Sequence, residues 1–104
     1  MTNQLVDHIR DALRVVIDPE LGHNIVDLGF VYDISAVDGA VCITMTATTP
    51  GCPAIRFLRD GVANAAARVP GTASVDIVVT FDPPWSPQRI EPETRSSLGF
   101  AAVN

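Results

Sequence analysis

The sequence predicts an α+β fold in which two amphipathic helices cover one face of a small three-stranded mixed sheet. Three observations support this fold class: apolar residues recur at helical spacing in two segments, they alternate with other residues in three more, and the order is helix, strand, strand, helix, strand. Helices and strands bury such apolar faces against each other, so a two-layer α/β sandwich is expected. A short C-terminal helix completes the expected order.

The first helix is expected over residues 3–16, where apolar side chains recur every three or four positions and charged side chains occupy the other side. The Asp18-Pro19 pair ends it, because a residue that precedes proline is disfavoured in the α conformation. A loop over residues 18–29 follows.

A β-hairpin is expected next. Residues 30–37 and 40–48 both alternate in polarity, and Asp38-Gly39 between them is typical of a two-residue hairpin turn. In the first strand Tyr32 is assigned to the same face as the apolar residues. One face of the second strand is predicted to be open or covered by a partner, and it carries Cys42, Thr44, Thr46 and Thr48.

The turn at residues 49–53 leads into a second amphipathic helix. Pro53 is expected at its first position, where the missing N–H costs nothing. The helix ends at Pro70-Gly71, since these two residues terminate an α-helix.

The last part of the chain combines a strand, a proline-rich loop and a helix. The strand is expected over residues 75–81, and the prolines that follow cannot donate to a ladder. The helix is expected over residues 92–98. The loops over residues 18–29 and 82–91 are the long irregular stretches, which makes them candidates for building a site.

Composition excludes several classes of protein. A chain of 104 residues, 47% of them hydrophobic, is expected to form one domain over residues 1–104. Its 12 acidic and 7 basic residues give a net charge of −5, which is the wrong sign for binding nucleic acid through phosphates. No apolar run approaches the roughly 20 residues that cross a membrane, and the N-terminus lacks the features of a secretory signal. We therefore expect a cytoplasmic protein that binds neither nucleic acid nor membranes.

Cys52 is the residue most indicative of function. It lies at the start of the second helix, whose N–H groups and partial positive charge would stabilise a thiolate and lower the pKa of the thiol. One interpretation is therefore a solvent-exposed, reactive cysteine, and the other is a cysteine that packs as a small apolar residue. Cys42 lies in mid-strand without neighbouring ligand-type residues and is interpreted as structural.

The loop before the hairpin concentrates carboxylates: Asp18, Glu20 and Asp27, with His23 among them. Carboxylate and imidazole groups can complete an iron or zinc site, or orient a thiol. Asp18 and Asp27 are also compatible with stabilising turns, and His23 lacks the spacing of a metal ligand.

No motif indicates an enzyme. A phosphate-binding glycine loop, a serine nucleophile elbow and a cysteine-rich zinc pattern are all absent from the sequence. A thiol-dependent enzyme with Cys52 as its nucleophile stays open as an alternative, and it would need His8 or His23 as its base.

Four segments of the chain carry a resemblance to a known family. They are Val-Ile-Asp-Pro-Glu-Leu at 16–21, Asn-Ile-Val-Asp-Leu-Gly-Phe-Val-Tyr at 24–32, Thr-Ala-Thr-Thr-Pro-Gly-Cys-Pro at 46–53, and Val-Thr-Phe-Asp-Pro-Pro-Trp-Ser-Pro at 79–87. In this order and spacing they resemble the PaaD/SufT-type metal–sulfur cluster assembly family, which is related to the eukaryotic cytosolic iron–sulfur targeting proteins. The resemblance spans residues 4–99.

The resemblance implies a small α/β sandwich that acts, without being an enzyme, in the maturation of iron–sulfur proteins. It implies Cys52 as the functional thiol and Asp18, Glu20 and Asp27 as auxiliary acidic residues; relatives are expected to have an apolar residue at His23. The phenylacetate oxygenase branch of the family carries a further cysteine-bearing tail. The sequence ends at residue 104 without one, so the resemblance implies the SufT-type branch.

Two mechanisms are compatible with this resemblance. A stable iron–sulfur cluster generally needs four ligands, mostly thiolates, so Cys52 would hold a labile cluster shared between the subunits of a homodimer. Alternatively, the protein is a clusterless adaptor that links a cluster donor to an apo-client. The expected partners are the assembly machinery and apo-client proteins, contacted through the open threonine face, Thr48, Thr49 or Trp85. Trp85 is also compatible with a lid over the core.

Overall fold

The computed structural model describes residues 4–97. The expected helix residues Asn3 and Leu98 lie outside this range. The helices and strands are α1 (Gln4–Ala12), the 3-10 helix η1 (Leu13–Val15), β1 (Ile17–Asp18), β2 (His23–Asn24), β3 (Val31–Val37), β4 (Ala40–Met45), α2 (Ile55–Ala67), β5 (Ser74–Val79), the 3-10 helix η2 (Pro87–Arg89) and α3 (Pro92–Ser97).

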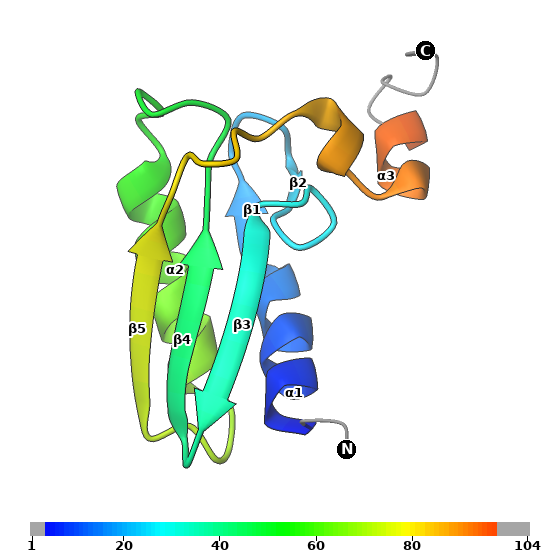
Figure 1. Ribbon diagram of the computed structural model, residues 1–104. Coiled ribbons are helices and arrows are strands. Elements are labelled where there is room, and N and C mark those ends of the chain that lie inside the picture. Colours follow the sequence, from blue (N-terminus) through cyan, green and yellow to red (C-terminus); the bar gives the residue numbers. More distant parts are fainter. Residues whose placement is uncertain (1–3, 98–104) are drawn as a thin grey trace.

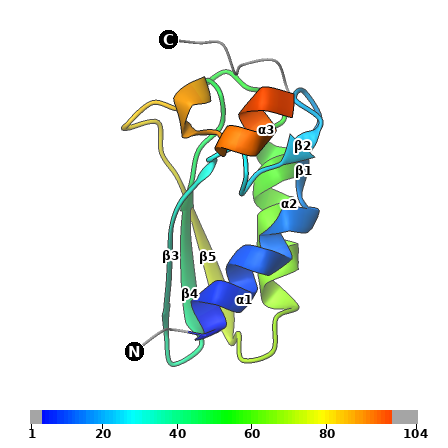
Figure 2. The same cartoon turned by 90° about the vertical axis from the view of Figure 1, so that its right-hand side faces the viewer.

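The main sheet has three strands in the order β3-β4-β5. Strands β3 and β4 pair antiparallel, and β4 and β5 pair parallel through the α2 crossover, which confirms the predicted mixed sheet. Helices α1 and α2 lie on one face of this sheet (Figures 1 and 2). The other face is not covered by any of the described elements (Figure 2). The predicted two-layer α+β fold is therefore confirmed.

The core lies between the sheet and the two helices. Val41, Ile43 and Met45 alternate along β4 and are at most 1% exposed, as the polarity pattern predicts. They share one core with Ile9 of α1 and Leu58 of α2. Burying each such side chain contributes roughly 1.5–3 kcal/mol, so these alternating positions specify which face of β4 meets the helices.

The predicted alternation fails in β3 at Tyr32. The pairing with β4 shifts register between Val31 and Asp33, so one extra residue enters β3 as a β-bulge. Tyr32 consequently leaves the apolar face: its hydroxyl donates to the carbonyl of Pro83 at 2.8 Å, and the Arg89 guanidinium lies 4.8 Å from its ring centre. Thr46, assigned to the open face, is fully buried beyond the end of β4.

The two long loops pack against each other at the end of the sheet where β4 and β5 finish (Figure 1). The Trp85 indole N–H donates to the carbonyl of Leu28 at 2.7 Å, and its ring meets Phe30 edge to face with centres 5.4 Å apart. Gly29 allows the close approach, because a Cβ there would collide with the backbone of Arg89. The loop over 82–91 is thereby fixed on the loop over 18–29.

Candidate functional site

The turn after β4 meets the short β1–β2 ladder near the carboxyl ends of β4 and β5. Strands β1 and β2, which the sequence did not predict, pair Asp18 with His23 and so form a tight connection that presents Glu20. The Cys52 thiol donates to Glu20 Oε1 at 3.2 Å, although the two residues are 32 positions apart. We call Cys52, Glu20 and Asp18 the thiol–carboxylate site.

Asp18 supplies a buried carboxylate to this site. Its side chain is 1% exposed; Oδ1 accepts a hydrogen bond from the Glu20 backbone N–H at 3.3 Å. Oδ2 is buried and has no hydrogen-bond partner among residues 4–97. A buried carboxylate oxygen without a partner costs free energy, so it is a position where a bound cation would be stabilised.

The electrostatics at Cys52 differ from the prediction. Cys52 is 6% exposed, and α2 begins only at Ile55. Burial raises the pKa of the thiol, and the carboxylates of Glu20 and Asp18 raise it further, while the backbone N–H of Ala54 lowers it. The backbone effect expected at the helix start is therefore present but outweighed, and the resting thiol is protonated at neutral pH. The prediction of a solvent-exposed thiol with a lowered pKa was wrong.

The pKa of Asp18 is shifted in the same direction as that of Cys52. Burial raises the pKa of its carboxyl group and the Glu20 charge raises it further, while the backbone N–H groups of Glu20 and Leu21 lower it without outweighing burial. Both buried groups of the site therefore bind protons more tightly than they do in water.

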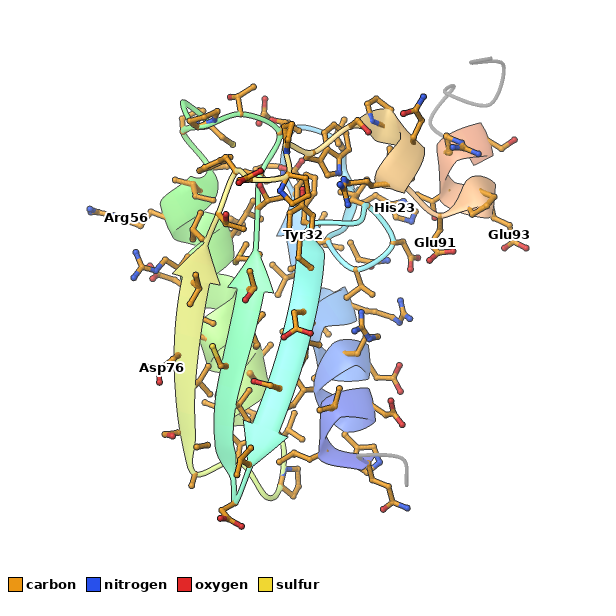
Figure 3. The ribbon with its side chains drawn as sticks, in the orientation of Figure 1. His23, Tyr32, Arg56, Asp76, Glu91 and Glu93 are labelled. Carbon is orange, nitrogen blue, oxygen red and sulfur yellow. The ribbon has the colours of Figure 1, made fainter. Side chains whose placement is uncertain are left out.

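Asp27 and His23 belong to a different cluster. The Asp27 carboxylate accepts hydrogen bonds from Arg14 at 2.7 Å and from the Asn24 amide at 3.0 Å, and His23 Nε2 lies 3.8 Å from its Oδ2. The Nε2 of His23 also lies 3.4 Å from the Thr94 hydroxyl, on the side where α3 packs (Figure 3). The structure thus brings Asp18 and Glu20 to Cys52, whereas it ties Asp27 to η1.

The roles of Arg14 and Thr94 were missed because no sequence signal links them to the loop. Asn24 could have been found, since an Asn three residues before Asp27 is typical of a side chain that caps a turn; its Oδ1 accepts the Asp27 backbone N–H at 2.9 Å.

The residues expected to contact partners differ in exposure. Thr49 is exposed and Thr48 is half-buried, and both adjoin the Cys52 turn. Trp85 is half-buried and packs against the core, as expected for a lid. Their role as partner contacts stays a prediction.

The site offers one sulfur and up to four carboxylate oxygens from two loops. These donors suit iron or zinc, but one thiol does not complete a cluster. Within residues 4–97, no three His, Cys, Asp or Glu side chains are grouped closely enough to hold a metal ion by themselves. A metal at this site would therefore need ligands from outside the described chain. Among the described helices, none is long and apolar enough to cross a membrane.

Comparison with known families gives a match to the model described as iron–sulfur cluster assembly protein, over residues 6–79. The chain is 38% identical to the Fe-S protein maturation auxiliary factor YitW of Bacillus subtilis, covering 96% of this chain and 99% of YitW. It is 36% identical to the Fe-S protein maturation auxiliary factor SufT of Staphylococcus aureus, covering 84% of this chain and 100% of SufT.

A longer relative and a solved structure extend the comparison. An iron-sulfur cluster carrier protein of Synechocystis is 33% identical over 89% of this chain, which corresponds to 26% of the carrier. The crystal structure of a domain of unknown function, DUF59, from Bacillus anthracis matches with a TM-score of 0.88 and 36% identity, covering 92% of each chain.

Proposed function

Since this chain belongs to the family of iron–sulfur cluster assembly proteins, we propose that it is a non-enzymatic factor that helps mature iron–sulfur proteins, with Cys52 as its functional thiol. On this proposal it works in the cytoplasm with the assembly machinery and apo-client proteins. Membership of the family indicates the process, which is the maturation of iron–sulfur proteins. The geometry of the thiol–carboxylate site supports a role in binding iron or a cluster as cargo.

One observation carries this proposal: the Cys52 thiol donates to the Glu20 carboxylate beside the unpartnered Oδ2 of Asp18. A purely structural cysteine would pack against apolar groups, and a buried carboxylate without a partner would lower stability. Two carboxylates next to one thiol lower the stability of the folded state unless a cation binds between them.

The arrangement provides a route for the thiol proton. When the cargo metal approaches, the S–H bond breaks, the proton moves to Glu20, and the sulfur becomes a thiolate that can bind the metal. Until then the raised pKa keeps the thiol neutral and protects it from oxidation, because the thiolate is the reactive form. Asp18 Oδ2 would provide a further oxygen.

A single thiol per site makes any bound cluster labile. Two chains would supply two thiolates, and carboxylates or external thiols would fill the remaining positions. Such a cluster, shared in a homodimer, is easily lost to chelators, and this lability suits a transfer function.

The clusterless adaptor is favoured by a different observation. Cys52 is buried and protonated at rest, which is the state of a structural thiol. On this alternative the chain brings donor and client together, and Cys52 only stabilises the turn. A thiol-dependent enzyme has less support, because His23 contacts Asp27 and Thr94, whereas the Cys52 thiol donates to Glu20.

Anaerobic reconstitution with ferrous iron and sulfide tests the carrier mechanism. The wild type should acquire a visible absorbance that chelators remove, and Cys52→Ser should lose it. Cys42→Ser is the matched control, since Cys42 lies within β4, and it should reconstitute normally. Absorbance that survives in Cys52→Ser would contradict the carrier. No absorbance in the wild type, with binding to apo-client proteins retained, would establish the adaptor.

A further inference from the structure

The outer edge of β5 is a surface that the thiol–carboxylate site does not use. The sheet has the order β3-β4-β5, and within residues 4–97 no strand pairs with β5 on the side away from β4 (Figure 1). An edge strand presents a row of unpaired backbone N–H and C=O groups, and such a row is a template for a further strand.

The groups that face outward belong to every second residue of β5. The N–H of Ser74 donates to the carbonyl of Gly39, and six residues later the N–H of Thr80 donates to the carbonyl of Met45. The register between β4 and β5 is constant in between, so the even-numbered residues direct their N–H groups to β4. The odd-numbered residues therefore direct theirs away from the sheet. We call these three residues the β5 edge: Val75, Ile77 and Val79.

No feature of the β5 sequence blocks pairing at this edge. Natural edge strands are commonly protected by lysine, by proline or by a bulge. The other outer strand, β3, has the bulge at Tyr32, whereas β5 has none of the three. Its one charged residue, Asp76, is even-numbered, so its backbone N–H faces β4 and its exposed side chain lies on the open face of the sheet. The β5 edge is therefore unbroken.

A hollow of about 310 Å³ adjoins the carboxyl end of the β5 edge, between the end of β5 and the start of α2. We call it the β5 hollow. Most of its lining is apolar, and both of its charged lining residues are arginines. The lining residues are Pro50, Ile55, Arg56, Arg59, Val79 and Phe81.

The two arginines of the β5 hollow are available to a partner. Among residues 4–97, neither Arg56 nor Arg59 takes part in an ion pair. Both are exposed, and they are three residues apart on α2, so they lie on one side of the helix. Figure 3 shows Arg56 extending outward on the side of the molecule where β5 lies. In a chain of net charge −5 this is a local positive surface, and its complement is an acidic group.

We propose that the β5 edge binds an extended segment of a partner protein as a fourth, antiparallel strand, with an apolar side chain in the β5 hollow and acidic side chains facing Arg56 and Arg59. The unpaired backbone groups specify this occupant, because an extended backbone offers donors and acceptors at the same spacing. Antiparallel pairing is the more stable ladder, and it brings the amino-terminal end of the segment to the arginines.

The charges favour such a partner over a second copy of the chain. Two copies that pair antiparallel through β5, centred on Ile77, would bring residues 73–75 of the second copy to the β5 hollow. These residues are Ala, Ser and Val, so the arginines would gain no acidic partner. A segment with acidic residues before its apolar residues would neutralise them.

The β5 hollow is close to the thiol–carboxylate site along the chain. Pro50 lines the hollow and belongs to the same turn as Cys52, whose N–H donates to the carbonyl of Thr49 at 3.1 Å. A strand bound at the β5 edge would therefore end beside this turn. For the identity of the partner, an apo-client or a cluster donor, the inference rests on the proposed function.

Peptides of about eight residues test the inference. All alternate valine with threonine; the first has two glutamates at its amino-terminal end, and the second has two lysines there. In fluorescence anisotropy titrations the glutamate peptide should bind, and the lysine peptide should bind at least about tenfold more weakly. Two further versions of the glutamate peptide are N-methylated, each on a different alternate set of amides. One should lose binding and the other should keep it, because an added strand pairs through one of its edges.

Amide hydrogen exchange, followed by NMR, checks the edge residue by residue. In the free protein the N–H groups of Val75, Ile77 and Val79 should exchange faster than those of Asp76 and Val78, which face β4. A saturating concentration of the glutamate peptide should slow exchange at the first three by about tenfold or more and leave the other two little changed. The odd-numbered and even-numbered residues of one strand are thus matched controls.

Arginine variants test the contribution of charge. Arg56→Glu combined with Arg59→Glu should remove the preference for the glutamate peptide. Arg68→Glu is the control and should keep it, since Arg68 is also exposed but lies at the opposite end of α2 and does not line the β5 hollow. The residues of the β5 edge stay unchanged, because their side chains pack against the core. Thermal melts should show that both variants fold, as each replaced side chain is exposed.

Four results would each overturn the inference: no binding of the glutamate peptide, equal binding of the lysine peptide, equal binding of the two methylated peptides, or slowed exchange only outside the β5 edge. Slower exchange at the β5 edge with rising protein concentration and no peptide would also overturn it, since the edge would then bind a second copy. The cargo is tested separately: Cys52→Ser should still bind the glutamate peptide, and the double arginine variant should still reconstitute with iron and sulfide.

Discussion

The environment of Cys52 decides its reactivity, and burial dominates over the backbone N–H of Ala54. Because the pKa of the thiol is raised, we predict that Cys52 reacts with iodoacetamide more slowly at neutral pH than the half-exposed Cys42. Mass spectrometry of the labelled peptides over a pH series measures both rates. Glu20→Gln removes one of the charges that raise this pKa, so it should accelerate labelling of Cys52. Faster labelling of Cys52 than of Cys42 in the wild type would contradict the assignment.

Asp18 gives a prediction for stability. Its pKa is raised by burial, so the folded state binds this proton more tightly than the unfolded state, and ionisation at neutral pH destabilises the fold. Asp18→Asn keeps an oxygen for the Glu20 N–H and removes the charge, so it should stabilise the protein by about 1 kcal/mol at neutral pH.

The sign of this effect depends on pH. The advantage of Asp18→Asn should be largest above the pKa of folded Asp18 and should shrink as the pH falls through it, because acid neutralises the wild-type carboxyl group. Urea unfolding at several pH values measures the difference. A destabilised variant at neutral pH, or a difference that grows in acid, would show that Asp18 is not strained. Asp18→Asn should also bind less iron on reconstitution. This would show that the buried charge that destabilises the fold also takes part in metal binding.

At the scale of elements, the contact between the two long loops depends on Gly29. Gly29 has φ of 77° and Gly22 has φ of 67°, but only the Cβ of a residue at 29 would meet the Arg89 backbone. We predict that Gly29→Ala destabilises the protein by about 2 kcal/mol or more, through strain and collision. Gly22→Ala is the matched control and should cost only about 1–2 kcal/mol for its backbone conformation. Equal losses in thermal unfolding would mean that the loop contact contributes little.

Elements with a local pattern were predictable from the sequence. The alternation along β4 and the apolar stripe of α2 each specify a periodicity and the face that is buried. In the hairpin turn, Asp38 and Gly39 both have positive φ, as the sequence predicts. Tyr32 was misassigned, because a bulge changes the parity of a strand without altering its composition.

The candidate site was only partly predictable for a similar reason. The resemblance selected Cys52, Asp18 and Glu20, and the structure brings these three together. It also selected Asp27, which instead binds Arg14. The pKa of Cys52 was misjudged because the rule for helix starts is local, whereas the burial and the two carboxylates arise from a segment about 30 residues away. Contacts between distant segments carry no periodic signal, so they required the structure.

For the whole molecule, the number of thiols links cluster binding to assembly. Each thiol–carboxylate site contains one sulfur, so a cluster with two protein thiolates requires two chains. We predict that the apo-protein sediments as a monomer and that reconstitution with iron and sulfide converts it into a dimer, which a chelator returns to monomer. Cys52→Ser should stay monomeric under the same conditions, and Cys42→Ser should dimerise like the wild type, because Cys42 lies within β4 and outside the thiol–carboxylate site. Analytical ultracentrifugation at the absorbance of the cluster and of the protein distinguishes these species. A visible cluster that sediments with a single chain would require further ligands from residues outside 4–97 or from solution, and it would remove the reason for a shared site.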